Sequence, residues 1–434
     1  MESALYMAVE IIVYILFFVL ITVRLAERKL FRRTIIDIPV IILLAIALVS
    51  FIKNESEVIA SAHNLRTLFR YIVLFYILSN LKLDKNAIER IFRMIIVLGV
   101  IQALIAIVQF LGGEGIKAYF YAKEVDLELA GQALNIRDPA LDRVGAGIGT
   151  LGQPSILAMF LLIASAVTSS MLFSENRRDI RETLLLFLSL LVILAGVLTT
   201  YKRAAILIAF SIPVMAMLFS RRKSAYLPLG IVLSLTAVFV ISVYGLLDEG
   251  GVVTGREARE HHVAITELLN NLFTEEYWSK SSSTSRLWFL RESLVTIFGS
   301  VNMLGYGPDP EHAIQLFVAD RRGLGRLLDY YAYKDVYWMA ILVYFGILGF
   351  TTWMYILLKL RKHAYRLRNR IDQIPIVRQM SVAILILIIV TFAYTFVERT
   401  LVIRAYAFYF WAIAGLLSSF VYKQDQLSQA TLDG

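Results

Sequence analysis

Long, continuous apolar runs separated by polar segments dominate the pattern of this chain. We predict about eleven membrane-spanning helices, with a range of ten to twelve, at residues 5–23, 34–52, 67–81, 91–111, 154–173, 183–200, 204–219, 226–247, 336–358, 378–397 and 401–421. A helix of about 20 apolar residues crosses the hydrocarbon core. Continuous runs favour helices over the alternating strands of a membrane barrel. The pattern therefore predicts an all-α polytopic membrane protein.

The polar segments fall into two alternating sets. One set is short and basic and comprises 24–33, 82–93, 174–182, 220–224 and 359–379, which with Lys423 hold 23 of the 43 Lys and Arg residues. The positive-inside rule places this set in the cytoplasm, and the long loops 113–153 and 248–335 outside. The N-terminus is then outside and the C-terminus inside. The first apolar run ends in basic residues without a small-residue cleavage site, so we expect it to be retained as a helix.

This topology predicts a division of the chain into four parts. Residues 1–247 form an N-terminal transmembrane bundle that includes the outer loop 113–153. Residues 248–335, between the eighth and ninth spans, form a helical extracytoplasmic subdomain, because polar stretches there alternate with amphipathic ones. Residues 336–421 form the C-terminal transmembrane helices. Residues 422–434 are a polar cytoplasmic tail.

Composition narrows the function classes. The chain is 58% hydrophobic, with mean hydropathy +0.69 and a net charge of +9. Basic loops that face anionic lipid account for this charge, so we expect no nucleic-acid partner. The absence of cysteine excludes disulfides and thiolate chemistry.

A few cations break the positive-inside trend. Lys202 and Arg203 in "LTTYKRAAILIAF" lie in a short turn that the topology places outside. Further cations on that side are Arg143, Arg286, Lys334, Arg399 and Arg404. Long cations at helix ends can snorkel to the headgroups, and this reading stays open, above all for Lys202. Charged groups at a membrane edge are also functional candidates, and the planar fork of arginine suits phosphate oxygens.

Four segments, in order between about residues 140 and 350, together resemble a known family. "LTTYKRAAILI" resembles the "T-x-S-R" helix start of the O-antigen ligase and polymerase superfamily of bacterial envelope glycosyltransferases (Wzy/WaaL-like). "GTLGQPSILA" is similar to its "G-T-F-G-x-P-N" segment. "SRLWFLRESLVTIFGSVNMLGYGP" is similar to its "S-R-x-x-x-W" segment, which runs into "G-x-G". "KDVYWMAILVYFGILGF" resembles the start of the helix that follows the large outer loop.

Some positions depart from the family pattern. Lys202 replaces the serine before the arginine, and Ser155 replaces an asparagine. Asp335 lies eleven residues before Gly346, where the family has His or Asp. The acidic residue favours a polymerase over a ligase.

The resemblance implies transfer of a glycan from undecaprenyl pyrophosphate to a hydroxyl of an acceptor glycan. Fixed cations would stabilise the pyrophosphate leaving group, and the resemblance assigns this role to Arg203 and Arg286. Arg143 is a third candidate, and Lys202, Lys334 and Arg399 are expected to help to bind substrate.

The acceptor hydroxyl needs a general base. Asp335 is the first candidate and Glu398 the second, with Asp309 and Glu311 behind them. A salt bridge to a neighbouring cation is the alternative role of each; for Asp335 the cation is Lys334.

Other residues of these segments are expected to contact substrate. Gln153 belongs to the second segment, and Tyr337 to a group of aromatic residues that could stack on sugars or form an interfacial belt (Tyr330, Tyr331, Tyr333, Tyr337 and Trp338). "GYGPDPEH", 305–312, is predicted to be a rigid turn that could shape the acceptor cleft.

We expect no metal and no cofactor. His261 and His262 are adjacent and would point about 100° apart on a helix, and neither a P-loop nor a dinucleotide fingerprint is present.

The expected partners are undecaprenyl-pyrophosphate-linked oligosaccharide, an acceptor glycan, membrane lipids and a chain-length regulator protein. The expected location is the bacterial inner membrane, with the active site on the periplasmic or extracellular side. The sequence predicts a polymerase for O-antigen or exopolysaccharide, which contributes to lipopolysaccharide and other polysaccharide biosynthesis in the cell envelope.

Three alternatives stay open. A ligase would transfer the glycan to lipid A-core or protein. A transporter or flippase predicts charges near mid-membrane, and internal repeats are not apparent. A structural or sensory membrane protein predicts dispensable outer cations.

Overall fold

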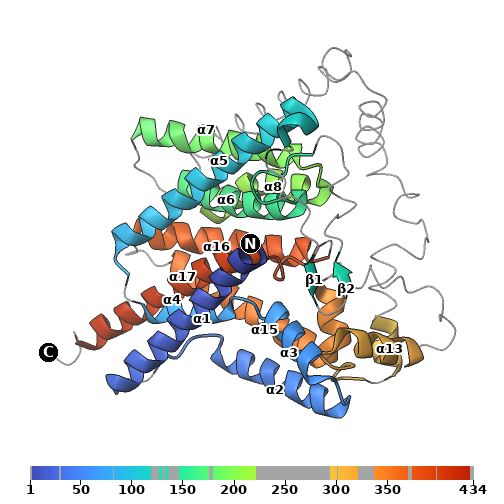
Figure 1. Ribbon diagram of the computed structural model, residues 1–434. Helices are drawn as coiled ribbons and strands as arrows, with labels where there is room; N and C mark the ends of the chain where they lie inside the picture. Colours follow the sequence, from blue (N-terminus) through green and yellow to red (C-terminus); the bar gives the residue numbers. More distant parts are fainter. Residues whose placement is uncertain are drawn as a thin grey trace. The chain divides into compact units, whose positions relative to one another are not determined.

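The computed structural model describes most of the chain (Figure 1). The described residues are 2–28, 31–81, 83–117, 119, 127–129, 132–134, 146–174, 179–220, 294–300, 302–320, 337–369, 374–396 and 398–430. Several predicted features lie outside them: the span at 226–247, Arg143, Arg286, Lys334 and Asp335.

Within these residues the fold is helical. The long elements are α1 (Glu2–Ala26), α2 (Asp37–Lys53), α3 (Val58–Leu68), α4 (Ile72–Asn80), α5 (Lys85–Lys117), α6 (Pro154–Ser174), α7 (Ile180–Thr199), α8 (Arg203–Ser220), α13 (Pro310–Asp320), α15 (Tyr337–Asn369), α16 (Pro375–Tyr394) and α17 (Arg404–Ala430). Two short antiparallel strands, β1 (Leu127–Leu129) and β2 (Gln132–Leu134), pair with Leu127 opposite Leu134.

Several of these helices are suited to a membrane. Among the described residues, six are long and apolar enough to span one: Ala8–Ala26, Lys85–Gly113, Pro154–Phe173, Ile180–Thr199, Tyr337–Asn369 and Pro375–Tyr394. Ala204–Ser220 is a shorter apolar helix. The predicted helical, membrane-embedded architecture is confirmed at this level.

The contacts divide the chain into two compact units. Unit 1 comprises 1–93 and 286–434, and unit 2 comprises 94–285, so the boundary falls inside α5. In unit 1, α4 packs against α17 and α2 against α15, so N-terminal and C-terminal helices share one core. The sequence-based division at residue 247 does not follow this grouping.

One predicted span is broken. The apolar run at 67–81 lies across α3 and α4, which meet at Tyr71 in the left-handed conformation (φ 62°). With nine residues, α4 is about 13 Å long at 1.5 Å per residue, too short to span a membrane alone. Arg70, between the two helices, makes an ion pair and a hydrogen bond described below.

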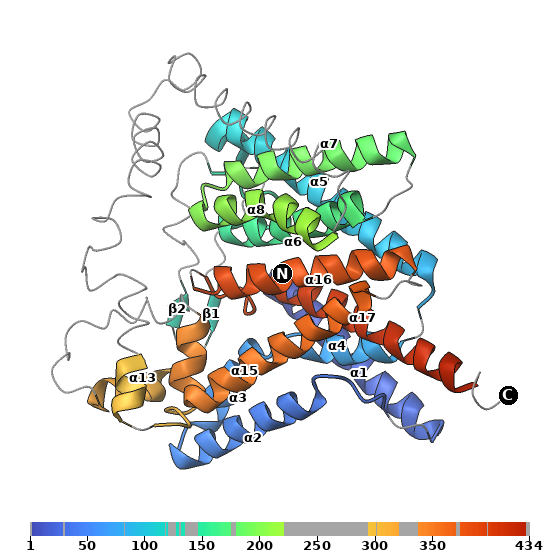
Figure 2. The ribbon, with the colours of Figure 1, turned by 180° about the vertical axis from the view of Figure 1, so that it is seen from behind.

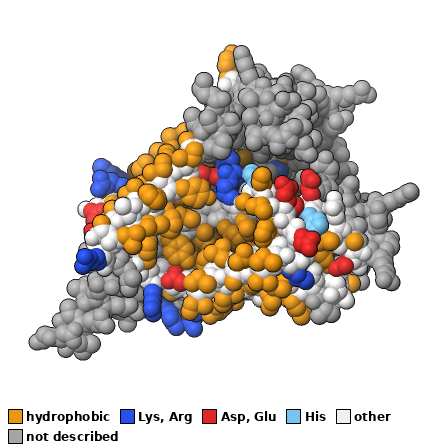
Figure 3. All heavy atoms as spheres, turned by 60° about the horizontal axis from the view of Figure 1, so that its bottom comes forward, with side chains coloured by type: hydrophobic (Ala, Val, Ile, Leu, Met, Phe, Trp, Pro, Cys, Tyr) orange, Lys and Arg blue, Asp and Glu red, His pale blue; other side chains and the backbone are white. Residues whose placement is uncertain are grey.

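The helix α2 carries apolar residues on all sides, because one face is buried in the protein and the opposite face is exposed. One face is buried in unit 1 and includes Leu43 and Ala47. The opposite face exposes an apolar stripe at helical spacing: Ile38, Ile41, Leu44, Leu48 and Ile52. Figure 3 shows that hydrophobic side chains cover most of the described part of one face of the molecule. Such a stripe suits contact with lipid chains.

The core of unit 2 is α6, which packs against α7 and α8. Of its most apolar stretch, 94% is buried inside the protein. Glycines let the neighbouring helices approach closely: a Cβ on Gly99 would lie 2.5 Å from the Cβ of Ala164, and one on Gly196 2.5 Å from that of Ala103. Small residues commonly mediate such packing in membranes.

The polar contacts of α1 in unit 1 form two separate groups, one on either side of its apolar stretch. Near its end α1 carries Arg24, which donates to the carbonyl of Asn80 at the end of α4 (3.0 Å). Near its start it carries Glu10, which contacts Arg70 before α4 and Arg404 at the start of α17. These two ends of α1 are about 21 Å apart along the helix. The basic segment 24–33 therefore lies at the end of α1 away from Glu10.

Candidate functional site

In unit 2, the segment 147–153 is held by two glutamines of α5. Gln109 is buried, and its Oε1 accepts hydrogen bonds from the backbone N–H groups of Ile148 (2.9 Å) and Gly149 (2.8 Å), while its Nε2 donates to the carbonyl of Gly149 (2.9 Å). Two turns earlier on the same face of α5, Gln102 Oε1 accepts a hydrogen bond from the backbone N–H of Thr150 (2.9 Å). The two side chains satisfy a backbone that forms no regular structure before α6 begins at Pro154.

The turn that carries Lys202 and Arg203 contacts this segment. The backbone N–H of Gly147 donates to the carbonyl of Thr199 (2.8 Å). Tyr201, with φ 52°, ends α7 in the left-handed conformation, and its ring lies 5.9 Å from that of Phe110 on α5. The residues just before the segment "GTLGQPSILA" therefore contact the turn of the segment "LTTYKRAAILI", in which Lys202 precedes α8 and Arg203 begins it.

In unit 1, the segment 302–309 fills a break in α15. Gly346 (φ 62°, ψ −164°) interrupts the helix and frees carbonyl groups of the preceding turn. Tyr306 N–H donates to the carbonyl of Val343 (2.8 Å) and Gly307 N–H to that of Tyr344 (3.2 Å). On the other side of the break, Leu348 N–H donates to the carbonyl of Met303 (3.2 Å). The third and fourth family-like segments are thus also joined by backbone hydrogen bonds.

Polar side chains of α2 and α3 hold the same segment from the other side. Ser50 donates to the carbonyl of Tyr344 (3.0 Å), and Asn54 Nδ2 lies 3.3 Å from the carbonyl of Gly305. Asn64 of α3 donates to the carbonyl of Pro308 (2.7 Å). Hydrogen bonds from α2, α3 and α15 therefore hold the backbone of the predicted turn.

Asp309 and Glu311, the candidates for the general base behind Asp335 and Glu398, lie where the segment 302–309 continues into α13. Asp309 is buried, and its carboxylate accepts from the backbone N–H groups of Glu311 (3.1 Å) and His312 (3.4 Å) and from that of Glu57 (3.4 Å). It thus caps α13 and ties it to the start of α3. Figures 1 and 2 show α13 beside the beginning of α15. Glu311 is exposed.

Tyr306 lies beneath α13, with its ring 5.6 Å from that of Phe317. Burial is the main cause that raises the pKa of its hydroxyl to about 12. The hydroxyl lies 3.2 Å from that of Ser300. Tyr306 is therefore a neutral, buried anchor of the segment.

The structure does not support sugar stacking by Tyr337. This residue is fully buried, with Trp338 and Trp353 at ring distances of 5.6 and 6.0 Å. Its hydroxyl donates to the carbonyl of Leu68 (3.3 Å). Trp338 is also fully buried and donates to the carbonyl of Phe392 (3.2 Å). Both rings belong to the core of unit 1 and present no face to a sugar, which corrects the expectation for Tyr337.

The turn between α16 and α17 carries further candidates. Glu398 and Arg399 are both half-buried there. The Nε atom of Arg399 is buried and has no hydrogen-bond partner among the described residues. Arg404 begins α17 a few residues later.

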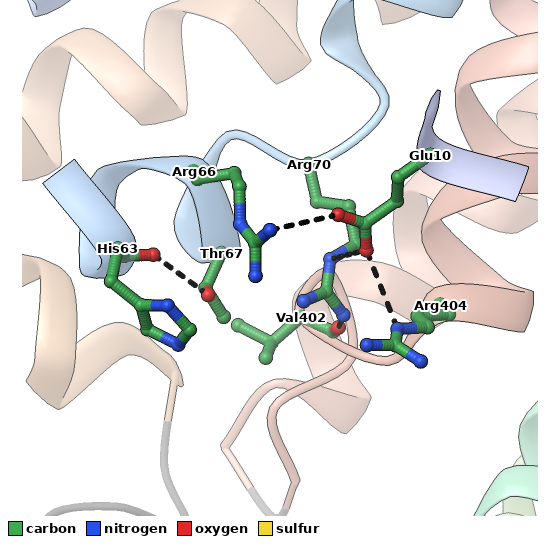
Figure 4. Close-up of polar contacts among 7 residues, drawn as sticks. All are labelled: Glu10, His63, Arg66, Thr67, Arg70, Val402 and Arg404. Carbon is green, nitrogen blue, oxygen red and sulfur yellow. Dashed lines mark hydrogen bonds and ion pairs between the residues drawn. The ribbon is translucent and has the colours of Figure 1, made fainter. Parts of the chain in front are cut away.

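Sequence reasoning missed a group of four charged side chains in unit 1, two of which, Glu10 and Arg70, are buried. We call it the arginine cluster: Glu10 of α1, Arg66 of α3, Arg70, and Arg404 of α17 (Figure 4). Glu10 Oε1 lies 3.0 Å from Arg70 Nε and 3.4 Å from Arg404 Nε, and Glu10 Oε2 lies 3.7 Å from Arg66 Nη1.

Arg70 also fixes the backbone beside this cluster. Its Nη1 donates to the carbonyl of Val402 (2.9 Å), which ties the turn before α17 to the junction of α3 and α4. A signal for the cluster was present in the sequence, because an acidic residue within the first apolar run needs a cationic partner, and Arg66 and Arg70 share a helical spacing of four.

The remaining predicted site residues are distributed over both units. Lys202 is half-buried, Gln153 is half-buried with its carbonyl accepting from Leu157 N–H (3.0 Å), and both belong to unit 2 with the backbone of Arg203. The joint action of Arg203 with Arg286 and Asp335 stays a prediction. No family model and no curated protein matches the chain.

Proposed function

We propose that this protein is an envelope glycosyltransferase of the bacterial inner membrane, most specifically a polysaccharide polymerase. It transfers a glycan from undecaprenyl pyrophosphate to a hydroxyl of an acceptor glycan on the periplasmic or extracellular side. The proposed topology keeps the loops 113–153 and 248–335 outside, with the broken pair α3 and α4 in place of the single predicted span at 67–81.

The observation that carries this proposal is the pairing of the four family-like segments. The segment 147–153 contacts the turn at 199–203, and the segment 302–309 fills the break in α15. Six of the ten positive-φ residues in the described part of the chain fall within the four segments: Gly149, Gly152, Tyr201, Gly305, Gly307 and Gly346. Unusual backbone conformations cost free energy and gather at functional sites. The sequence resemblance and the backbone thus point to the same places.

The polar ends of unit 1 support the side of the membrane that we propose. The end of α1 near Glu10 lies with Arg404, which the predicted topology places outside, and with Arg70, which lies near the start of the predicted span 67–81. The opposite end of α1 lies with the basic segment 24–33 and Asn80. Separate groups of polar contacts at the two ends of α1 are consistent with the predicted alternation of cytoplasmic and outer loops.

The proposed chemistry uses charge and one base. Arg203 and Arg286 stabilise the negative charge that grows on the pyrophosphate as the sugar–phosphate bond breaks. Asp335 accepts the proton of the attacking hydroxyl. The products are the extended glycan on its carrier, free undecaprenyl pyrophosphate and the protonated base, which returns its proton to water.

A strain that lacks the gene tests this function. Complementation with the wild type should restore long glycan chains, and Arg203→Ala should leave single repeat units. Arg221→Ala is a matched control, because Arg221 follows the other end of α8 in a loop predicted to be cytoplasmic. Normal polymers that fail to reach lipid A-core would show a ligase instead. Lipid-linked glycan retained on the cytoplasmic side would overturn the proposal in favour of a flippase.

A further inference from the structure

The last third of α15 has an exposed side that is strongly basic. From Lys359 to Asn369 the helix carries five Lys and Arg residues, and α15 contains no Asp or Glu. Arg361, Lys362 and Arg366 are exposed. Side chains four positions apart lie on one side of a helix, and adjacent ones lie about 100° apart. These three cations therefore form one continuous surface, which we call the basic face.

The opposite side of the same stretch is packed inside the protein. Leu360, Ala364 and Leu367 are buried, so the helix keeps an apolar inner side to its last turn. The neighbours of α15 in unit 1 include α2 and α16. The basic face is thus the outer surface of a helix that is anchored by its inner side, which holds the three cations at fixed positions along the helix.

The basic face continues an exposed apolar surface of the same helix. Leu348, Tyr355 and Leu358 are 44%, 45% and 54% exposed and precede the basic face at helical spacing. Lys359 Nζ lies over the ring of Tyr355, 5.0 Å from its centroid. Exposed apolar residues of a membrane helix suit contact with lipid chains, and tyrosine gathers where the chains meet the headgroups. The headgroup layer is therefore expected to begin near Leu358.

The depth of the cations matches this layer. Arg361 and Lys362 lie about 4.5 and 6 Å beyond Leu358 along the helix axis, and Arg366 about 12 Å beyond it. The headgroup layer is roughly 5–8 Å thick on each side of a membrane. Because the Cα–Cβ bonds of a helix tilt toward its N-terminus, these long side chains lean back toward the apolar stretch. All three charged groups can therefore reach lipid phosphates.

We propose that the basic face of α15 binds anionic phospholipids of the cytoplasmic leaflet. Arg361 and Arg366 donate paired N–H groups to phosphate oxygens, and Lys362 adds a compact charge between them. Negative lipid headgroups in the cytoplasmic leaflet attract basic segments that directly follow a membrane span. A lipid fits this surface better than an acidic protein does, because one lipid molecule can place its headgroup on the cations and its chains on the adjoining apolar surface. The proposal does not rest on the proposed transfer reaction.

Lipid binding to the purified full-length protein in detergent tests the basic face. The probes are phosphatidylglycerol, which carries one negative charge, and phosphatidylcholine with the same chains, which is neutral overall. The test variant combines Arg361→Gln, Lys362→Gln and Arg366→Gln. A basic residue near anionic lipid contributes about fivefold in affinity, so this variant should lose roughly 10- to 100-fold of the preference for phosphatidylglycerol. Its binding of phosphatidylcholine should be unchanged.

Two control variants separate the basic face from net charge and from folding. Arg321→Gln, Arg322→Gln and Arg326→Gln together remove the same charge from the loop 248–335 and should keep the preference. Arg361→Lys with Arg366→Lys keeps the charge and should retain most of it. In the test variant, removal of like charges four residues apart relieves repulsion, so its thermal midpoint without added lipid should be equal or slightly higher.

The outcomes are distinct. Loss of the preference in the test variant alone supports the basic face. A wild-type preference in the test variant, an equal loss in the loop variant, or equal binding of both lipids to the wild type would overturn the proposal. Tighter binding of soluble polyglutamate than of phosphatidylglycerol would indicate an acidic protein as the partner and would overturn it as well.

Discussion

The break in α15 makes a sharp prediction about two glycines. In Gly346→Ala, the new Cβ would lie 2.3 Å from the carbonyl oxygen of Met303 and 2.6 Å from the backbone nitrogen of Gly305. These are backbone atoms, so no side-chain rotation relieves the clash. Gly346 also has φ 62° and ψ −164°, a combination that is essentially restricted to glycine.

The expected cost follows from two contributions. The unfavourable backbone conformation costs about 1–3 kcal/mol. Displacement of the segment 302–309 would weaken its three backbone hydrogen bonds to α15, each worth about 1 kcal/mol. Gly346→Ala should therefore lower the free energy of unfolding by roughly 3–6 kcal/mol. Gly305→Ala should act similarly, because its Cβ would lie 2.5 Å from Gly346 N.

Thermal unfolding of the purified protein in one detergent measures the effect. Gly299→Ala is the matched control, since no atom lies within 4 Å of its Cβ and the residue is helical. This control should be neutral or raise stability by up to about 1 kcal/mol. The midpoint of Gly346→Ala should fall by several degrees or the folded protein should be lost. If Gly346→Ala and Gly299→Ala have the same midpoint and yield, the close approach at the break is refuted.

Three further predictions concern the rest of the chain. Gln109→Leu should lose all three hydrogen bonds to the segment 147–153 and destabilise unit 2 by roughly 2–4 kcal/mol, measured by thermal unfolding with Gln102→Leu as a milder comparison. Asp335→Asn should reduce polymerisation of purified lipid-linked repeat units by about 10²–10⁴-fold, and near wild-type activity would move Glu398 into the role of base. A cysteine at Ser282, in this chain without native cysteine, should react with an impermeant reagent in spheroplasts; protection would place the loop 248–335 inside.

The positions of most helices could be predicted from hydrophobicity alone. Long apolar runs such as 154–173 and 183–200 correspond closely to α6 and α7, because nothing in those runs competes with helix formation. The run at 67–81 failed as a single span. Arg70 lies near its beginning, and its contacts with Glu10 and Val402 require a turn where hydropathy predicts a continuous helix.

The spacing of Arg66 and Arg70 indicated part of the arginine cluster, but its partners Glu10 and Arg404 could not be derived from sequence spacing. Glu10 and Arg404 are separated by almost the whole chain, and only the packing of α1 and α17 in one unit brings them together. The burial of Tyr337 could not be predicted either, because an aromatic residue at a helix start has the same sequence pattern whether its ring contacts a sugar or packs in a core. By contrast, the glycines of "GYGP" correctly indicated an unusual backbone, since Gly305 and Gly307 both have positive φ.

The break in α15 joins this helix to the segment 302–309, and this junction bears on the proposed catalysis. A break inside an apolar helix exposes carbonyl groups that lipid cannot satisfy, so a second segment must supply N–H donors. The segment 302–309 does so, and it continues the stretch that begins at Arg286, while α15 begins two residues after Asp335. These hydrogen bonds therefore join the chain before residue 310 to the helix that begins at Tyr337. We propose that this junction matters for glycan transfer, because Arg286 precedes the segment 302–309 in the sequence and Asp335 precedes α15, and transition-state stabilisation requires preorganised groups. A substitution at Gly346 should then reduce glycan transfer even under conditions where the protein stays folded.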